Sequence, residues 1–415
     1  MLDLDTLAWL ASAEGRSVLQ DLAGEPLAGA TRLATLARLR KTLSPPRAAA
    51  ALETALLRRR AAAKFSRADA MFFTREALEQ ASGEEVARHR AARFAGSAVV
   101  LDLGCGAGGD TVALAAVPAI ERVIAVDRDP LRLAMARLNA GAYGVAGRIR
   151  FVCADYTATP LPPADAVFLD PARRAGGRRV FSIHDYTPPL AIVRDLLARY
   201  PGGAAKISPG VDYQELAGLG LAAEVEIVSL RGECKEATLW LGGLRRVARR
   251  ATILPSGVEL ADHDAAAPTS IAPRPLAPGP SGPAPIRPPG RYLYEPDCAI
   301  VRAHLVAHLA TRFGLAQLDP EIAYLTGDAP PESLAPYAAG FAVLDAFPFS
   351  LKELNRRLRA AGVGRVVIKK RGLPIEPDHF RRQLKLAGDA ERVIVLTRVQ
   401  NAAYMLICSP PGFAA

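Results

Sequence analysis

The glycine-rich stretch VVLDLGCGAGGDTVALA, residues 99–115, limits the possible folds of this chain more than any other feature. An apolar run enters a turn rich in glycine and continues into a run with helical spacing. Glycines let the backbone approach a ligand closely, and the first turn of a helix presents unpaired N–H groups. The stretch therefore predicts a strand, a ligand-binding turn and a helix, which is how an α/β domain begins.

The same alternation recurs after this turn. The short apolar runs AVVLDLG, RVIAVDR, RIRFVCAD and DAVFLDP each end in an acid or a glycine, and helical stretches separate the first three. This pattern predicts βαβ units and a parallel sheet. GGAAKIS, AEVEIVSL and EATLWLGG are expected to add later strands, and the last two lie close enough in the sequence to pair antiparallel. The expected fold class is α/β, with a Rossmann-like core and a mostly parallel sheet.

The rest of the chain divides by composition. Apolar residues recur at helical spacing in LATLARLRKTL and AALETALLRRRAAAKF, which predicts helices. Pro, Ala and Gly dominate HDAAAPTSIAPRPLAPGPSGPAPIRPPG, which is typical of a linker. Later runs such as DCAIVRAHLVAHLATRFG and RVIVLTRV predict a last, small α/β domain. The expected domains are a helical region at 1–95, the α/β core at 96–262, a linker at 263–290 and the small domain at 291–415.

The glycine turn fits two kinds of ligand. Gly104, Gly106 and Gly109 satisfy the GxGxxG pattern of dinucleotide-binding turns. Asp102, however, would repel a pyrophosphate, whereas it can hold the ammonium group of a methionine. Asp110 stands where a bound phosphate would need neutral amides. We therefore favour S-adenosylmethionine over a dinucleotide, with a turn that binds nothing as the alternative.

Acids also follow the next strands of the predicted sheet. In open parallel sheets, ligands bind beyond the carboxyl ends of the strands. Asp127 can accept hydrogen bonds from ribose hydroxyls, and Asp155 from an adenine amino group. Asp129 and Pro130 read as the N-cap and first residue of a helix, which is a structural role. The candidate cofactor-binding residues are Asp102, Gly104, Gly106, Asp110, Thr111, Asp127, Arg128, Asp155 and Tyr156.

Composition narrows the class of protein. The five cysteines contain no CxxC pair and the histidines no metal-ligand spacing, so we expect a reducing cytoplasm and no metal site. The N-terminus MLDLDTLAWLA is acidic where a secretory signal is basic, and acids interrupt the apolar residues 98–120, so we expect no membrane span. A net charge of +10 is compatible with RNA but also with a generally arginine-rich composition. The sequence does not predict an oligomeric state.

Three resemblances to known families follow from these motifs. The first four predicted strands and their turns resemble a class I S-adenosylmethionine-dependent methyltransferase. KFSRADAMFFTREALEQASGEEVARHRAARF, residues 64–94, is similar to the lead-in of trimethylguanosine synthase-like RNA guanine-N2 methyltransferases. YLYEPDCAIVRAHL, FPFSLKELNRRLRAAGVGRVVIKKRG and RRQLKLAGD resemble the THUMP-like domain that follows bacterial methyltransferases of this type. Because THUMP domains bind RNA, the resemblance implies an RNA partner.

The segment FLDPARR, residues 168–174, is the candidate acceptor site. In amino methyltransferases, an acid and a following proline carbonyl accept the two amine hydrogens, so we expect Asp170 and Pro171 to be catalytic. Ala172 and Arg173 replace the proline and aromatic residue that usually complete this motif. The expected reaction is methyl transfer to a base amino nitrogen, with guanine N2 favoured. The alternatives are an inactive RNA-binding module and a methyltransferase for small molecules or proteins.

Further residues are candidates for contacting RNA. A base could stack on Phe72 or Phe73, whose alternative role is helix packing, or on an arginine plane. Arg173 and Arg174 could bind phosphates or belong to a surface loop. The strand end at Lys369, Lys370 and Arg371 could touch RNA or form a solvated turn.

Overall fold

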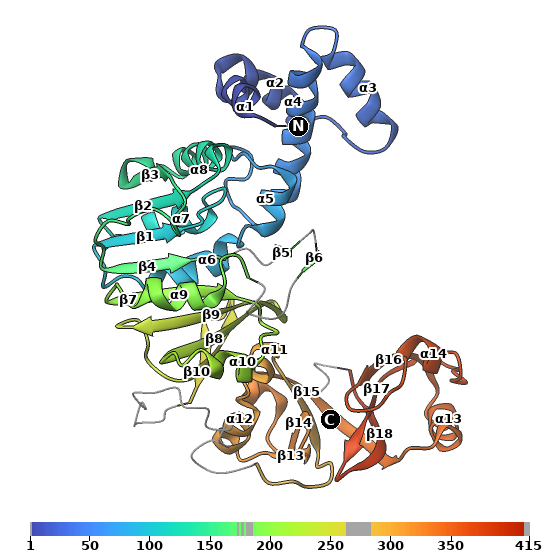
Figure 1. Cartoon of the computed structure of the whole chain (residues 1–415). Helices are drawn as coiled ribbons and strands as arrows, with labels where there is room; N and C mark the ends of the chain where they lie inside the picture. The colour runs from blue at the N-terminus through green and yellow to red at the C-terminus, as the bar shows by residue number, and fades with distance from the viewer. Residues whose placement is uncertain (1, 172–173, 176–177, 180–185, 263–283, 411–415) are drawn as a thin grey trace. The chain divides into compact units, whose positions relative to one another are not determined.

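The structure is a computed structural model that describes residues 2–171, 174–175, 178–179, 186–262 and 284–410. Its contacts divide the chain into two compact units. Unit 1 comprises residues 1–223 and 238–246, and unit 2 comprises residues 224–237 and 247–415. Figure 1 labels the helices and strands along the chain.

Unit 1 begins with the predicted helices. Their bounds are α1 Leu4–Ala11, α2 Ala13–Ala23, α3 Ala30–Leu39, α4 Pro45–Ala61, α5 Arg75–Gln80 and α6 Glu84–Ala92. Apolar side chains of this region pack into one core with Ala107 and Met135, which belong to the α/β part of the unit. The helical lead-in is thereby fixed to the elements that carry the glycine turn.

The sheet of unit 1 confirms the predicted parallel architecture. Its strands are β1 Val99–Leu103, β2 Arg122–Asp127, β3 Ile149–Cys153, β4 Ala166–Leu169, β7 Gly202–Ile207 and residues 238–242 of β9 Glu233–Gly242. The order is β9-β7-β4-β1-β2-β3, and the pairs between β7 and β3 are all parallel. Parallel neighbours bring their carboxyl ends to one edge of the sheet, which is where the candidate acids follow β1, β2, β3 and β4.

Helices connect these strands. They are α7 Gly109–Ala115, α8 Pro130–Ala142, the 3-10 turn η1 Ala146–Arg148, α9 Leu190–Leu197 and α10 Tyr213–Gly218. The side chain of Asp129 accepts from the N–H groups of Leu131 and Arg132 at 2.9 and 3.3 Å, which confirms it as the N-cap of α8. α7 and α8 pack against β2, as Figure 1 shows. After β4 the chain forms a short antiparallel pair, β5 Arg174–Ala175 and β6 Arg178–Arg179.

Unit 2 contains strands of two sheets. β8 Ala223–Leu230 connects to β9 through Arg231 and Gly232, which have φ values of 52° and 80°. Two-residue turns with positive φ are typical of connections between antiparallel strands. The turn therefore agrees with the antiparallel pairing predicted for AEVEIVSL and EATLWLGG. β10 Arg249–Leu254 pairs parallel with β8, and β11 Val258–Ala261 pairs antiparallel with β10.

The second sheet forms the C-terminal part of unit 2. Its order is β13-β14-β12-β15-β18-β17-β16. The strands are β12 Tyr292–Pro296, β13 Ala316–Asp319, β14 Ile322–Gly327, β15 Ala338–Pro348, β16 Val363–Lys370, β17 Ala390–Val399 and β18 Ala402–Cys408. The helices are α11 Cys298–Arg302, α12 Val306–Phe313, the 3-10 turn η3 Pro331–Leu334, α13 Leu351–Ala360 and α14 Pro377–Arg381. The predicted helix DCAIVRAHLVAHLATRFG is two helices, because His304 takes a φ of 58° and breaks the run between α11 and α12.

The core of this C-terminal part consists of two apolar clusters. One is built around Leu293, Tyr324 and Leu406, and the other around Leu354, Leu358 and Ile394. Across both units, none of the helices within the described ranges is long and apolar enough to cross a membrane.

Candidate active site

Asp102 is a buried acid with one unused oxygen. Its side chain lies near the end of β1 and is 1% exposed. The Thr111 hydroxyl donates to Oδ2, whereas Oδ1 has no hydrogen-bond partner among the described residues. Burial raises the pKa of the Asp102 carboxyl to about 8, and the negative charge of Asp110 adds to this rise. A buried acceptor without a partner is costly, so this site suits a ligand that brings a cationic donor.

The glycine turn leaves its backbone open to a ligand. Gly104 and Gly106 have φ values of 78° and 55°, which L side chains rarely adopt. A Cβ added to Gly106 would meet no atom within 4 Å, so space is available directly above the turn. The N–H of Gly106 donates to Oδ2 of Asp127 at 2.9 Å, which joins the turn to the end of β2.

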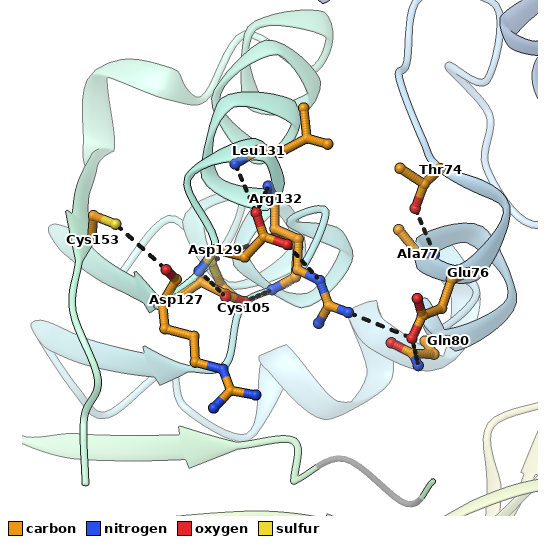
Figure 2. A network of polar contacts seen from close by, with 12 residues as sticks. Thr74, Glu76, Ala77, Gln80, Cys105, Asp127, Asp129, Leu131, Arg132 and Cys153 are labelled. Carbon is orange, nitrogen blue, oxygen red and sulfur yellow. Dashed lines mark hydrogen bonds and ion pairs between the residues drawn. The ribbon is translucent and has the colours of Figure 1, made fainter. Parts of the chain in front are cut away.

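Asp127 is held from two sides at the end of β2. Its Oδ1 accepts from the N–H of Asp129 at 2.9 Å, while Oδ2 accepts from Gly106. Figure 2 shows Asp127 beside Cys105 and Asp129, with Arg132 extending from the start of α8 toward Glu76 of α5. These bonds fix the carboxylate at the edge where the parallel strands end, which is the place predicted for a ribose contact.

Asp155 and Tyr156 follow β3 on the same edge of the sheet. Asp155 is exposed, and hydrogen bonds from the hydroxyl and N–H of Thr157 lower its pKa. The Tyr156 ring lies 3.9 Å from the position of a Cβ on Gly104, so it borders the glycine turn. Burial raises the pKa of Tyr156, and the charges of Asp127 and Asp155 raise it further. Tyr156 therefore remains a neutral phenol beside the turn, and Arg128 lies exposed nearby.

Asp170 directly follows β4 and forms an ion pair that the sequence reasoning missed. The ammonium of Lys206, on β7, lies 2.6 Å from Oδ2 of Asp170. The Lys206 side chain is 4% exposed and that of Asp170 is 26% exposed. Lys206 also donates to the Ser82 hydroxyl at 3.0 Å. The carboxylate is thus fixed from inside the protein and still reaches the surface.

Asp110 and Thr111, which are predicted to bind the cofactor, make contacts within the protein. Asp110 forms an ion pair with Arg90 of α6 and accepts from the Ser82 hydroxyl at 3.2 Å. Burial alone would raise the pKa of Asp110, but the charges of Arg90 and Lys206 hold it below its ordinary value. Thr111 is fully buried behind Asp102. Thr111 therefore contacts Asp102 directly, whereas Asp110 contacts Ser82 and Arg90.

The predicted stacking role of Phe72 and Phe73 is wrong. Their side chains are 3% and 2% exposed and belong to the core of the helical region. Phe73 stacks on Phe65 with ring centroids 5.4 Å apart, and the backbone of Phe72 exchanges two hydrogen bonds with the Asn139 side chain. The packing alternative therefore holds, because an enclosed ring offers no face to a base.

The other predicted RNA contacts differ in how accessible they are. Lys369 and Arg371 are half-buried and share Glu295, at 2.5 and 3.4 Å, whereas Lys370 is exposed. Arg173 lies outside the described residues. Arg174 is described only as the backbone of β5, paired with Arg179.

Local sequence patterns only weakly indicate the residues around Asp170 that were not predicted, namely Lys206, Ser82 and Arg90. Lys206 is the charged member of GGAAKIS, a strand in which every residue is buried, so a lysine there needs a partner. Ser82 and Arg90 lie in the helical lead-in and precede the glycine turn. Nothing in their local pattern connects them to Asp170, since the contact depends on how the lead-in packs.

The donor set at the sheet edge fits S-adenosylmethionine. Asp102 offers an unpartnered buried oxygen to an ammonium group, the space above Gly106 admits a ligand, and Asp127 presents a fixed carboxylate to ribose hydroxyls. Four consecutive strands of the sheet, β2, β1, β4 and β7, position these groups: Asp127, Asp102 and Lys206 lie on β2, β1 and β7, and Asp170 directly follows β4. A candidate cofactor-binding acid and a candidate acceptor acid are therefore neighbours.

Comparison with known proteins agrees with this site. A profile described as RNA cap guanine-N2 methyltransferase matches residues 97–184, a THUMP domain-like profile matches residues 338–410, and a domain of unknown function matches residues 3–61. A crystal structure of a proposed methyltransferase from Porphyromonas gingivalis aligns with a TM-score of 0.76 and 20% identity over 100% of both chains, which shows a shared fold. An uncharacterized S-adenosylmethionine-dependent methyltransferase of Mycobacterium tuberculosis is 40% identical over 358 residues, which cover 84% of this chain and 92% of that protein. This chain belongs to the family of S-adenosylmethionine-dependent methyltransferases.

Proposed function

We propose that this methyltransferase acts on RNA and methylates an exocyclic amino nitrogen, with N2 of guanine favoured. The observation that carries the proposal is the position of Asp170 and Pro171 at the carboxyl end of β4, one strand away from Asp102. The Asp170 carboxylate is partly exposed and is fixed by Lys206. It can therefore accept a hydrogen bond from a substrate that approaches this edge of the sheet.

The residues of the chain mainly bind and align the reactants. When bound, S-adenosylmethionine supplies an activated methyl group. Asp102 would hold the ammonium end of the cofactor and Asp127 its ribose. Asp170 and the Pro171 carbonyl would accept the two hydrogens of the acceptor amine and so direct the nitrogen lone pair. Alignment of this kind can account for a large part of the rate, because the methyl group already has a good leaving group. The product ammonium then sheds its proton.

The choice of RNA rests on independent support. The matches to an RNA cap guanine-N2 methyltransferase profile and to a THUMP domain-like profile both favour an RNA substrate. In addition, basic side chains lie exposed on α13, at the end of β16 and near α14: Lys352, Arg359, Lys370, Arg382 and Lys385. Lysine and arginine contacts to phosphates supply most of the sequence-independent affinity for nucleic acids.

The experiment is methyl transfer from a labelled cofactor to total RNA, followed by nucleoside mass spectrometry. We expect label in RNA and the methyl group on N2 of guanosine. A methyl group on a ribose or on a ring carbon would overturn the amino-nitrogen assignment. Label only in protein or in small molecules would overturn the RNA assignment, and RNA binding without any transfer would show an inactive binding module.

A further inference from the structure

Lys206 is a charged side chain in the middle of a buried strand. All residues of β7 are buried, and the Lys206 side chain is 4% exposed. An ammonium group taken out of water loses strong hydration, so it remains charged only where fixed acceptors replace that water. The acceptors around Lys206 are therefore the reason that this position tolerates a lysine.

The contacts of Lys206 restrict the orientation of Asp170. One N–H group of Lys206 donates to Oδ2 of Asp170 at 2.6 Å, and another donates to the Ser82 hydroxyl at 3.0 Å. Because the ammonium holds Oδ2, the carboxylate cannot rotate freely about its Cβ–Cγ bond. With respect to the described residues, Oδ1 of Asp170 is then the oxygen left for an incoming donor.

Ser82 is itself fixed in position. A serine hydroxyl has one hydrogen and two lone pairs. Ser82 donates its hydrogen to Asp110 at 3.2 Å and accepts from Arg90 and Lys206, each at 3.0 Å. The hydroxyl therefore has no spare hydrogen-bonding capacity and holds the ammonium of Lys206 in one place.

We propose that Lys206, held by Ser82, is a positioning residue that orients the Asp170 carboxylate toward the acceptor amine. This inference rests on the proposed function, in which Asp170 contacts the acceptor. A group that aligns a reactant must be held to within a fraction of an ångström, and supporting side chains supply that restraint. An amide at position 170 would remove the carboxylate that directly contacts this buried ammonium, which would keep only the Ser82 hydroxyl and the less direct charge of Asp110.

This pairing can be tested with three variants, Lys206→Met, Asp170→Asn and the double variant. Methionine keeps the length of the side chain and removes its charge, and asparagine keeps one oxygen acceptor. We expect Lys206→Met to lower kcat by about 10-fold or more, the cost of a small misalignment, with the KM for the cofactor unchanged. Asp170→Asn should be slower still and less thermostable. The double variant should melt higher than Asp170→Asn, since no charge is left unpaired, but it should remain slow because no carboxylate is left for the acceptor.

The control is Lys235→Met, which removes an exposed lysine that is paired with Glu233 on β9 and should not change the rate. If melting temperatures of the double variant were the sum of the two single effects, the contact between the two side chains would be absent and the inference overturned. A Lys206→Met enzyme as fast as the wild type would overturn the positioning role alone and leave the proposed function standing. A wild type that methylates no amino nitrogen would overturn both.

Ser82→Ala tests the support behind Lys206. The variant leaves Lys206 and Arg90 each without one acceptor, so we expect a kcat about 3-fold to 10-fold lower than wild type and an unchanged cofactor KM. Ser82→Thr keeps the hydroxyl and should retain more activity than Ser82→Ala. Equal activity in Ser82→Ala and wild type would remove Ser82 from the inference.

Discussion

The two sides of this candidate active site hold their acids in opposite ways. On the donor side, formed by Asp102, the glycine turn at 104–109 and Asp127, the Asp102 carboxyl is buried with one oxygen unpartnered among the described residues. On the acceptor side, formed by Asp170, Lys206 and Ser82, the acid already has a cation 2.6 Å away. The donor side is therefore ready to receive positive charge from a ligand. The acceptor side is already compensated and offers only directed hydrogen-bond acceptors to a neutral amine.

The largest expected effect is on the acceptor side. Asp170→Ala should lower the methyl-transfer rate by about 10²-fold or more, because the group that aligns the acceptor is gone. Cofactor affinity should stay within about threefold, since Asp170 is not part of the donor side. Single-turnover kinetics and calorimetry measure the two quantities.

The loss of Asp170 also leaves Lys206 unpaired, so folding must be separated from catalysis. Asp170→Ala combined with Lys206→Met removes both charges and should melt higher than Asp170→Ala, but it should remain as slow. Wild-type transfer rates in either variant would mean that the site is not built around this acid.

On the donor side, a substitution should change cofactor affinity more than the methyl-transfer rate. Asp102→Asn removes the partner of the cofactor ammonium and should weaken cofactor binding by about 1.5–3 kcal/mol, the range for a hydrogen bond to a charged group. The rate at saturating cofactor should change much less. Asp165→Asn is a matched control, since Asp165 directly precedes β4 and accepts from the N–H of Val99, at the end of β1 away from the glycine turn. Equal affinities of Asp102→Asn and wild type would remove Asp102 from the binding site.

The pH dependence of cofactor affinity should further distinguish the donor side from the acceptor side. Because the pKa of Asp102 is raised to about 8, the free protein carries a protonated, neutral carboxyl at lower pH. A cationic ligand prefers the ionised form, so cofactor affinity should rise by up to about tenfold per pH unit toward pH 8 and level off above it. The charged groups that face Asp102 are Asp110 of α7, Asp170 and Arg90 of α6. Calorimetry from pH 6 to 9 measures this slope, which Asp102→Asn should abolish; a slope that persists in that variant belongs to another group.

A last expected effect is on the pH dependence of stability. Asp102 ionises at about 3.8 when unfolded and at about 8 in the folded protein, so between these values the folded state binds one more proton. Stability from this residue is therefore fully present below pH 4 and is lost as the pH rises toward 8. Asp102→Asn removes the penalty, so its melting temperature relative to wild type should be higher at pH 8 than at pH 5, by about 2–4 °C per kcal/mol. A difference that does not change with pH would show that Asp102 keeps the same protonation state on unfolding.

The donor side could be predicted because its residues are contiguous or end successive strands. Asp102 and the glycine turn lie within a single strand-turn-helix, and Asp127 ends the next strand, so periodicity alone places them together. The acceptor side brings together residues 82, 170 and 206. Their contact brings together the segment before α6, the end of β4 and β7, and local patterns do not encode it.

Other differences between the sequence predictions and the structure also follow from what local patterns leave open. Phe72 and Phe73 sit in a run whose composition suits both stacking and packing, and only the surrounding helices decide that they are buried. In the C-terminal part, β16, β17 and β18 were predictable from their apolar runs. β12, β13 and β14 were not, because each is only four to six residues long, and β15 was not because its alanines and glycine have low strand propensity. The domain boundaries given by composition stay predictions.

The contacts of the Ser82 hydroxyl affect which fragment of the chain could be active in another protein. Ser82 and Arg90 both precede residue 96, the predicted start of the catalytic domain. A fragment of residues 96–262 grafted into another protein would carry every donor-side acid with it. It would arrive without the hydroxyl and the guanidinium that complete the acceptor side. Such a fragment would be expected to bind the cofactor without transferring the methyl group efficiently. An active fragment would have to include the helical lead-in.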